Sequence, residues 1–212
     1  MKYAPLTARL AGLGGAKWEV HARARALKQA GEAVIELTIG EPDVPAPAEL
    51  IAAATRAMED GRTGYSNGHG EPGLLRALAA RYSARRGRVF GPENVMTLPG
   101  TQTTLYAVLN TLVAAGDEVL LGDPMYATYE GLVASTGATL VRVPLHPEHG
   151  FRMQAADVAA RITPRSRVLF LNTPHNPTGA VLQRAEIEAL GQLARAHDLW
   201  IVSDEVYEDL VL

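Results

Sequence analysis

An apolar run near the end of the chain, LWIVSD, stops on a carboxylate at Asp204, and Tyr207 follows three residues later. Such a run predicts a buried strand. Removing an ionised carboxylate from water costs several kcal/mol unless a cation or hydrogen-bond donors approach it. The charge of Asp204 therefore needs a partner, and the identity of that partner decides what chemistry the carboxylate can do.

Polar and aromatic residues follow three other apolar runs. A helix is expected to begin at Thr101 and Gln102, and the free backbone N–H groups at its start suit a phosphate. Tyr126 offers a ring that can stack on a ligand, and Asn176 offers an amide for a ring hydroxyl. Ligands of parallel α/β sheets bind at the carboxyl ends of the strands. Together with Asp204, these residues suit a phosphorylated, positively charged aromatic ligand.

The segments that must position these residues show the pattern of repeated βα units. From about residue 94, short β-branched runs alternate with amphipathic stretches that mostly end in Gly or a polar turn residue. The expected strands are 94–98, 117–122, 139–145, 167–172 and 199–204, and the expected helices are 101–116, 127–137 and 184–198. This pattern predicts an α/β fold, a three-layer sandwich with a mostly parallel sheet between helices.

The segment before residue 94 has a different pattern. It contains helical stretches at 20–31, 48–61 and 74–87, a short predicted strand at 34–37, and a loop rich in Pro and Gly. We expect it to form an N-terminal helical arm that leads into the main domain.

Composition limits the class of protein. With 212 residues, 47% of them hydrophobic, the chain is long enough to bury one substantial core. A net charge of -3 gives no basic surface for nucleic acid, and the lack of cysteine excludes disulfides. No apolar stretch approaches the roughly 20 residues that span a bilayer, so we expect a cytoplasmic protein with no membrane partner. His146 and His149 lie in a polar turn without a third ligand, and we expect no metal site.

Six segments of the chain occur in the same order in a known family. They are GEPD, YSNGHGEPGLLRALA, PGTQ, GDEVLLGDPMY, NTPHNPTG and SDEVY. In this ordered set the chain resembles the fold-type I, pyridoxal-phosphate-dependent aminotransferases of class I and II, from about residue 37 to residue 209. Within the family it looks most similar to arginine:pyruvate aminotransferases, with aspartate-type aminotransferases as near relatives.

The resemblance assigns roles to the residues at the predicted strand ends. Asp204 would hold the proton on the pyridinium nitrogen of pyridoxal 5'-phosphate, which lets the ring act as an electron sink. Tyr207 and Asn176 would hydrogen-bond the phenolic oxygen of the ring, and Tyr126 would stack on its face. Tyr126 and Asn176 are also expected to contact the substrate.

The resemblance also implies a phosphate site and a partner subunit. Gly100, Thr101 and Gln102 would hold the cofactor phosphate. Tyr65 would reach the phosphate of a neighbouring subunit, and the backbone of Gly40 would contact the substrate carboxylate. The protein is therefore expected to form a homodimer when full length.

The chain departs from the family in its lysines. Transamination needs a lysine that holds the cofactor as a Schiff base and moves a proton, and the family places it a few tens of residues beyond the aspartate. The only lysines here are Lys2, Lys17 and Lys28, all before the cleft motifs, so no catalytic residue is assigned. The arginine that would grip the substrate carboxylate belongs to the same missing part.

We therefore expect a truncated aminotransferase, inactive by itself. Residues 1–45 would form the N-terminal arm and part of the small domain, and residues 46–212 the front portion of an incomplete cofactor-binding large domain. In the family's sheet, two later strands separate 94–98 from 199–204. Without them the first strand would lose its neighbours and the last would become an exposed apolar edge. A reduced pseudoenzyme is the alternative.

Three functions are compatible with these residues. The favoured one is an aminotransferase that moves an amino group from an amino acid to a 2-oxo acid by a ping-pong mechanism. A lyase or synthase of the same fold, such as a carbon–sulfur β-lyase, would keep every cofactor residue named above. A regulator that senses the cofactor would need a DNA-binding domain ahead of the arm, for which the chain has neither space nor basic charge.

Overall fold

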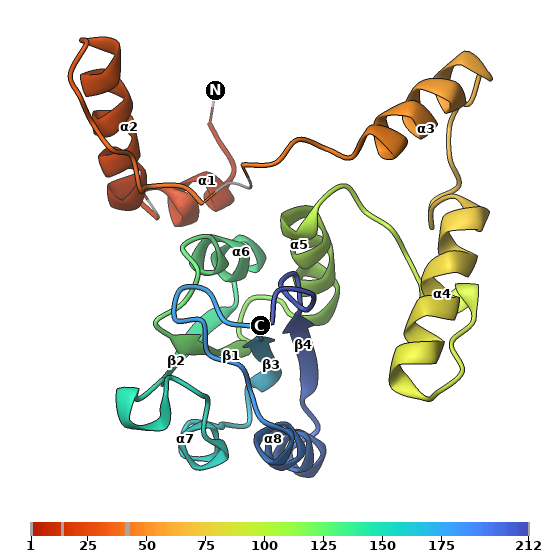
Figure 1. Ribbon diagram of the computed structural model, residues 1–212. Helices are drawn as coiled ribbons and strands as arrows, with labels where there is room; N and C mark the ends of the chain where they lie inside the picture. The colour runs from red at the N-terminus through yellow and green to blue at the C-terminus, as the bar shows by residue number, and fades with distance from the viewer. Residues whose placement is uncertain (1, 14, 41–42, 212) are drawn as a thin grey trace. The chain divides into compact units, whose positions relative to one another are not determined.

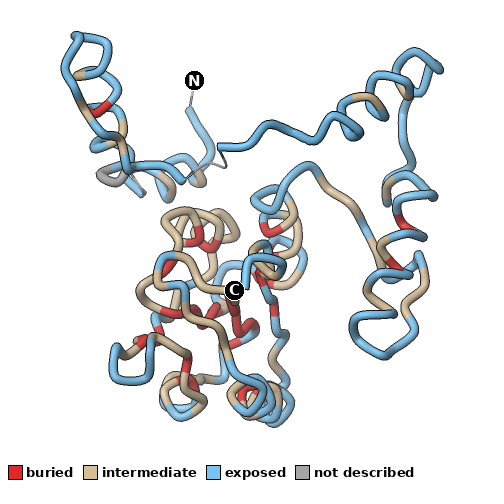
Figure 2. Tube along the Cα trace, in the orientation of Figure 1, coloured by how far each residue is buried: buried red, intermediate tan, exposed pale blue. Residues whose placement is uncertain are grey.

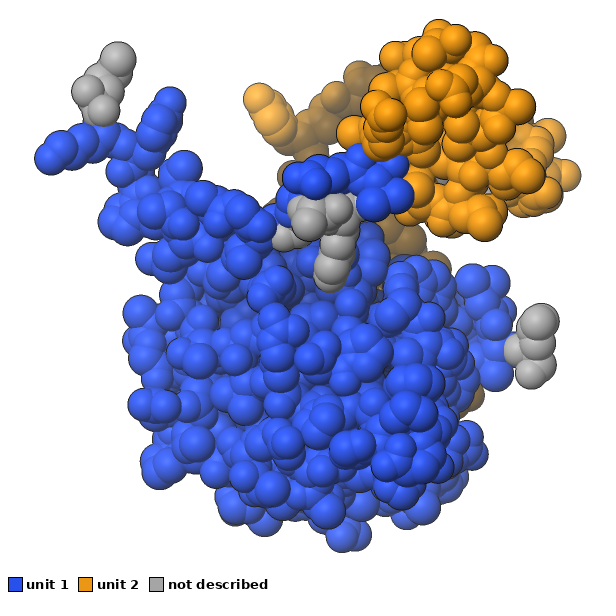
Figure 3. All heavy atoms as spheres, turned by 90° about the vertical axis from the view of Figure 1, so that its left-hand side faces the viewer, with its two compact units in different colours: residues 1–20, 101–212 blue, residues 21–100 orange. Residues whose placement is uncertain are grey.

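The computed structural model describes residues 2–13, 15–40 and 43–211, and the chain forms two compact units. Residues 1–20 and 101–212 make up one unit, which we call the sheet unit, and residues 21–100 make up the other, which we call the helical unit (Figure 3). The domain boundary predicted near residue 45 stays a prediction.

A four-stranded parallel sheet forms the centre of the sheet unit (Figure 1). Its strands are β1 Glu118–Asp123, β2 Thr139–Pro144, β3 Ser166–Asn172 and β4 Trp200–Asp204, in the order β2-β1-β3-β4. The strands are parallel because each connection crosses over through a segment that contains a helix. The predicted α/β class with a parallel sheet is confirmed.

Eight α-helices occur among the described residues. Their bounds are α1 Pro5–Leu10, α2 Gly15–Gln29, α3 Ala48–Glu59, α4 Pro72–Arg86, α5 Thr101–Leu112, α6 Tyr129–Thr136, α7 Ala155–Ala159 and α8 Arg184–Ala196, with short 3-10 helices at Pro92–Asn94 and Pro147–His149. Their ends follow local chemistry: α6 stops where Gly137 adopts a φ of 84°, which a residue with a side chain rarely tolerates. Sequence reasoning missed α1 and α7, which are too short to show a clear helical period.

Alternating side chains bury the two faces of the sheet under different helices. In β1, Val119 and Leu121 pack with α5 and α6, whereas Leu120 packs with α7 and α8. Successive residues of a strand point to opposite faces, so an unbroken apolar run predicts a strand that is covered on both sides. Figure 2 shows the buried residues gathered at this sheet. The result is the expected three layers.

Neither of the segments 94–98 and 34–37 forms the predicted strand, although the loss of neighbours by 94–98 was expected. A strand needs a neighbour whose backbone accepts and donates its hydrogen bonds, and no strand pairs with either segment in the part of the chain that the structure describes. Some of their backbone N–H groups donate elsewhere: Thr97 donates to the carbonyl of His69, and Val34 donates to the carbonyl of Glu32. β4 lies at an edge of the sheet and exposes Trp200, as expected.

The helical unit buries few side chains. Of its described residues, only Ala24, Leu75 and Ala79 are buried. None of the helices formed by the described residues, in either unit, combines the length and the apolar character that crossing a membrane requires.

A buried carboxylate anchors the amino end of β1. Glu118 is only 3% exposed, and it accepts hydrogen bonds from the hydroxyls of Thr163, at 2.5 Å, and Ser166, at 3.1 Å. The Arg165 guanidinium donates at 2.6 Å. These contacts connect the start of β1 to the turn that leads into β3. The hydrogen bond from Thr163, more than the other partners, holds the pKa of Glu118 below its usual value despite burial.

Replacing Glu118 by glutamine is expected to lower the free energy of unfolding by about 1–3 kcal/mol, because buried donors lose their acceptor. A carboxyl whose pKa is lower in the folded state stabilises the fold above its unfolded pKa. That contribution disappears as the pH falls through the folded value. The difference between Glu118→Gln and wild type in urea unfolding should therefore be full at pH 7 and shrink below roughly pH 4.

The matched control for this prediction is Glu188→Gln, because Glu188 forms an exposed pair with Arg184. Such a pair is worth about 0.5 kcal/mol at most. Equal unfolding midpoints for the two variants at pH 7 would show that Glu118 is no anchor.

Candidate functional site

The carboxyl ends of β3 and β4 meet at one edge of the sheet. The strands run parallel in a register that sets Asn172 directly beside Asp204. Both residues end their strands, and both are buried although they are polar. Burial without hydrogen bonds would cost several kcal/mol for each group, so their partners define the site.

Asp204 has two neutral hydrogen-bond donors. The phenol of Tyr129 donates to Oδ2 at 2.8 Å, and the backbone N–H of Val206 donates to Oδ1 at 3.1 Å. No cationic side chain forms an ion pair with Asp204 among the residues that the structure describes. A carboxylate has about four lone-pair positions, so Asp204 has room for a further donor.

Burial raises the pKa of the Tyr129 phenol far above its usual value, and the hydrogen bond to Asp204 raises it further. The phenol therefore keeps its proton near neutral pH. It acts only as a neutral donor toward Asp204, and it does not compete with a cation for the charge.

Asn172 connects β4 to the loop that follows β3. Its Nδ2 donates to the backbone carbonyl of Asp204 at 3.1 Å and to that of Pro174 at 3.2 Å, while its Oδ1 accepts from the backbone N–H of Asn176 at 2.8 Å. The side chain of Asn176 donates to the hydroxyl of Tyr207 at 3.3 Å. The structure thus brings together Asn176 and Tyr207, which the resemblance assigns to the same ring oxygen.

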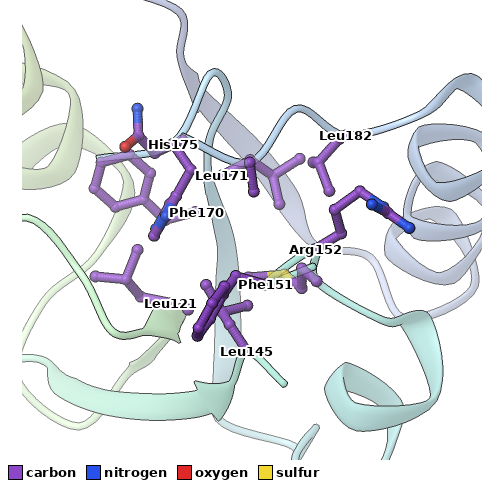
Figure 4. Close-up of a pocket in the computed structure, with 12 residues that line it drawn as sticks. Leu121, Leu145, Phe151, Arg152, Phe170, Leu171, His175 and Leu182 are labelled. Carbon is purple, nitrogen blue, oxygen red and sulfur yellow. The ribbon is translucent and has the colours of Figure 1, made fainter. Parts of the chain in front are cut away.

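An open cleft of about 510 Å³ adjoins this pair. It is lined by Pro174, His175, Asn176, Pro177, Gly179, Val181, Tyr207, Leu210 and Val211. A second cavity, shown in Figure 4, has mostly apolar walls and a volume of only about 20 Å³. That is space for about one water molecule. The cleft beside Asn176 and Tyr207 therefore has room for a ligand of the size of a substituted pyridine, whereas the cavity in Figure 4 does not.

Tyr126 lies between β1 and α6 and is half-buried. Its ring meets the ring of Tyr129 edge to face, with centroids 5.5 Å apart and planes at 78°. This is a favourable geometry for an aromatic pair. Tyr129 therefore contacts both Tyr126, whose ring the resemblance assigns to the cofactor face, and Asp204.

The predicted phosphate residues lie at the start of α5. Thr101 is its first residue, Gln102 its second, and Gly100 precedes it with a φ of 88°. The amide of Gln102 donates to the hydroxyl of Thr128 at 2.6 Å, which joins the start of α5 to the start of α6. The free N–H groups at the start of a 12-residue helix suit an anion.

Tyr65 and Gly40 belong to the helical unit, where both are exposed. Their roles toward a neighbouring phosphate and a substrate carboxylate stay predictions. Glu41 and Pro42 of the GEPD segment, and the side chain of Lys17, lie outside the described residues. Lys28 pairs with Glu36 at 3.3 Å within the helical unit. The described residues contain no group of three or more His, Asp or Glu residues that could hold a metal.

Sequence reasoning missed two residues of the site, Asn172 and Tyr129. Asn172 could have been noticed as the one polar residue that ends the apolar run RVLFLN. Tyr129 lies three residues after Tyr126 and reads as an ordinary apolar position of an amphipathic helix. Only its contact with a carboxylate 75 residues away reveals its role.

These features match what pyridoxal 5'-phosphate would need. The cofactor presents a ring nitrogen that can carry a proton, a ring oxygen and a phosphate. The site offers a buried carboxylate with neutral donors, an amide–phenol pair and a helix start. A parallel sheet with polar groups at its carboxyl edge is the architecture of the α/β proteins that bind ligands at the strand ends.

Comparison with known proteins gives the family. The family model for aminotransferases of class I and II matches residues 32–212, so the chain belongs to that family. It is 46% identical to the arginine–pyruvate transaminase of Pseudomonas aeruginosa over 211 residues, which are 100% of this chain and 54% of that protein. The expected resemblance to this group of enzymes and to aspartate aminotransferases is confirmed.

Two relatives from Thermus thermophilus support the same assignment. The aspartate/prephenate aminotransferase is 38% identical over 91% of this chain and 50% of its own length. A solved structure of an aspartate aminotransferase double mutant superposes with a TM-score of 0.91 at 36% identity, covering 98% of this chain and 54% of that one. The chain thus spans about half the length of the relatives it matches.

Proposed function

We propose that this chain carries the cofactor-binding portion of a pyridoxal-phosphate-dependent aminotransferase. The enzyme would move an amino group from an amino acid to a 2-oxo acid by a ping-pong mechanism. One observation carries the proposal: Asp204 is a buried carboxylate that receives only neutral hydrogen bonds from the described residues, beside the paired Asn176 and Tyr207. Family membership supports the same reading.

Each residue of the site has a task in this proposal. Asp204 keeps a proton on the ring nitrogen, and Asn176 and Tyr207 donate to the ring oxygen. Tyr126 covers one face of the ring. When bound, the cofactor supplies an electron sink for the substrate α-carbon. These four side chains would hold and orient that ring, and none of them would perform the proton transfer.

The proposed reaction needs further parts that the family supplies. A lysine that holds the cofactor, an arginine for the substrate carboxylate and a second subunit that receives Tyr65 are proposed on the basis of the family. Gly40 would contact the substrate, and Gly100, Thr101 and Gln102 would hold the phosphate. The pairing of donor and acceptor in the Pseudomonas relative, arginine and pyruvate, is the first to test.

Binding of pyridoxamine 5'-phosphate tests the proposal, because this form of the cofactor needs no lysine. We expect the chain to bind it with a roughly micromolar Kd and Asn176→Ala to weaken binding about 10-fold, the effect of one lost hydrogen bond. Isothermal titration calorimetry measures both.

The control variant is Asn110→Ala, whose amide donates only to the backbone of its own helix. It should bind like wild type, and pyridoxamine without the phosphate should bind more weakly. The proposal fails if the wild-type chain does not distinguish pyridoxamine 5'-phosphate from inorganic phosphate.

A further inference from the structure

Among the described residues, Tyr129 is the only buried tyrosine, and its hydroxyl contacts Asp204, a residue proposed to hold the cofactor. It begins α6 and is only 2% exposed. None of the roles that the resemblance implies uses it. Its hydroxyl reaches Asp204 Oδ2 at 2.8 Å, across 75 residues of sequence.

The ring of Tyr129 is fixed on two sides by other aromatic rings. Phe170 of β3 packs against it with centroids 4.7 Å apart and planes at 50°, and Tyr126 meets it edge to face. A ring that is held between two others has little freedom to move its hydroxyl. The donor to Asp204 is therefore preorganised before any ligand binds.

The hydrogen bonds to Asp204 restrict the rotation of the carboxylate. Val206 N–H holds Oδ1 and Tyr129 holds Oδ2, so the plane of the group is set by two donors on opposite oxygens. A charge-assisted hydrogen bond is strong only when donor and acceptor are aligned. Because the Tyr129 phenol is neutral, it aligns the carboxylate without neutralising it.

We propose that Tyr129 is a positioning residue that aims Asp204 at the protonated ring nitrogen of the cofactor and, through ring packing, holds Tyr126 over the ring face. This inference rests on the proposed function. It predicts that Tyr129 makes the site prefer a ring that contains a nitrogen over a ring that lacks one. A role in the stability of the fold alone would not produce this preference.

Two ligands separate these effects. One is pyridoxamine 5'-phosphate, and the other is its 1-deaza analogue, in which C–H replaces the ring nitrogen. We expect wild type to prefer the first, and Tyr129→Phe to lower the ratio of the two Kd values roughly 5- to 10-fold. In an Asp204→Asn background, Tyr129→Phe should have no further effect on the ratio, because the two residues act on one contact.

The matched control is Tyr106→Phe, an exposed tyrosine on α5, which should keep the wild-type ratio. Asp204→Glu serves as a second variant if Tyr129→Phe melts early. Its longer side chain keeps the charge but displaces the carboxylate from the Tyr129 hydroxyl, so the ratio should fall as well.

The outcomes distinguish the two proposals. If wild type binds both ligands equally, Asp204 does not contact a ring nitrogen, and the proposed function loses its main support together with this inference. If wild type prefers pyridoxamine 5'-phosphate but Tyr129→Phe keeps that preference, only the role of Tyr129 is overturned. Weaker binding of both ligands by the same factor would also overturn it, since that indicates a packing role alone.

Discussion

Replacing Asp204 by alanine is expected to slow amino-group transfer roughly 10²- to 10³-fold in a longer form of the protein that contains the lysine. This is the size of effect seen when one preorganised electrostatic partner of a reacting group is removed. The carboxylate is buried and held by two donors on opposite oxygens, so its removal takes away an oriented partner of the proposed ring nitrogen. Phosphate contacts at the start of α5 should keep the cofactor bound.

Stopped-flow absorbance of the half-reaction with a single amino acid measures this loss, and equilibrium dialysis measures retention of the cofactor. Asp60→Ala is the control, because Asp60 is exposed at the end of α3 in the helical unit. Turnover by Asp204→Ala that stays near the wild-type rate would remove Asp204 from the site.

The second prediction with a large expected effect concerns covalent attachment of the cofactor to lysine. When the 212-residue chain is mixed with pyridoxal phosphate and reduced with borohydride, we expect no stoichiometric attachment of the cofactor to a single lysine. Attachment needs a lysine amine held at the cofactor aldehyde, and the chain has only Lys2, Lys17 and Lys28. Lys28 is already paired with Glu36 in the helical unit.

Mass spectrometry of the digested protein gives the stoichiometry at each lysine. A variant with all three lysines changed to arginine is the control, because its labelling reports the background at groups other than lysine. A full equivalent of cofactor on Lys17 or Lys28 would mean that the chain is a rearranged, working enzyme and not part of a longer one.

Residues with a local signature could be predicted from the sequence. Tyr126, Asn176, Asp204 and Tyr207 each follow an apolar run, and a strand that is buried on both faces must end where polar residues begin. The helices that separate the runs show a helical period, which is also a local property. The parallel order and the edge that carries the site then follow from the alternation of strands and helices.

The strand predicted at 94–98 shows the limit of local information. Its residues favour an extended conformation, but a strand exists only when another strand accepts its backbone hydrogen bonds. In the structure Thr97 donates to His69 instead, and no ladder forms there among the described residues. Propensity describes what a segment can adopt, and pairing decides whether it does.

The sequence by itself determined that this protein is an α/β chain of the aminotransferase family with a carboxylate, an amide and two tyrosines at its strand ends. Only the tertiary structure decided how that carboxylate is held. Tyr129, which lies outside the six family segments, donates to the carboxylate from 75 residues away. Asn172, the first residue of NTPHNPTG, donates to the backbone carbonyl of Asp204 from 32 residues away. A buried polar group must find donors wherever the fold brings them, so the identity of those donors depends on packing between distant segments and not on any local pattern.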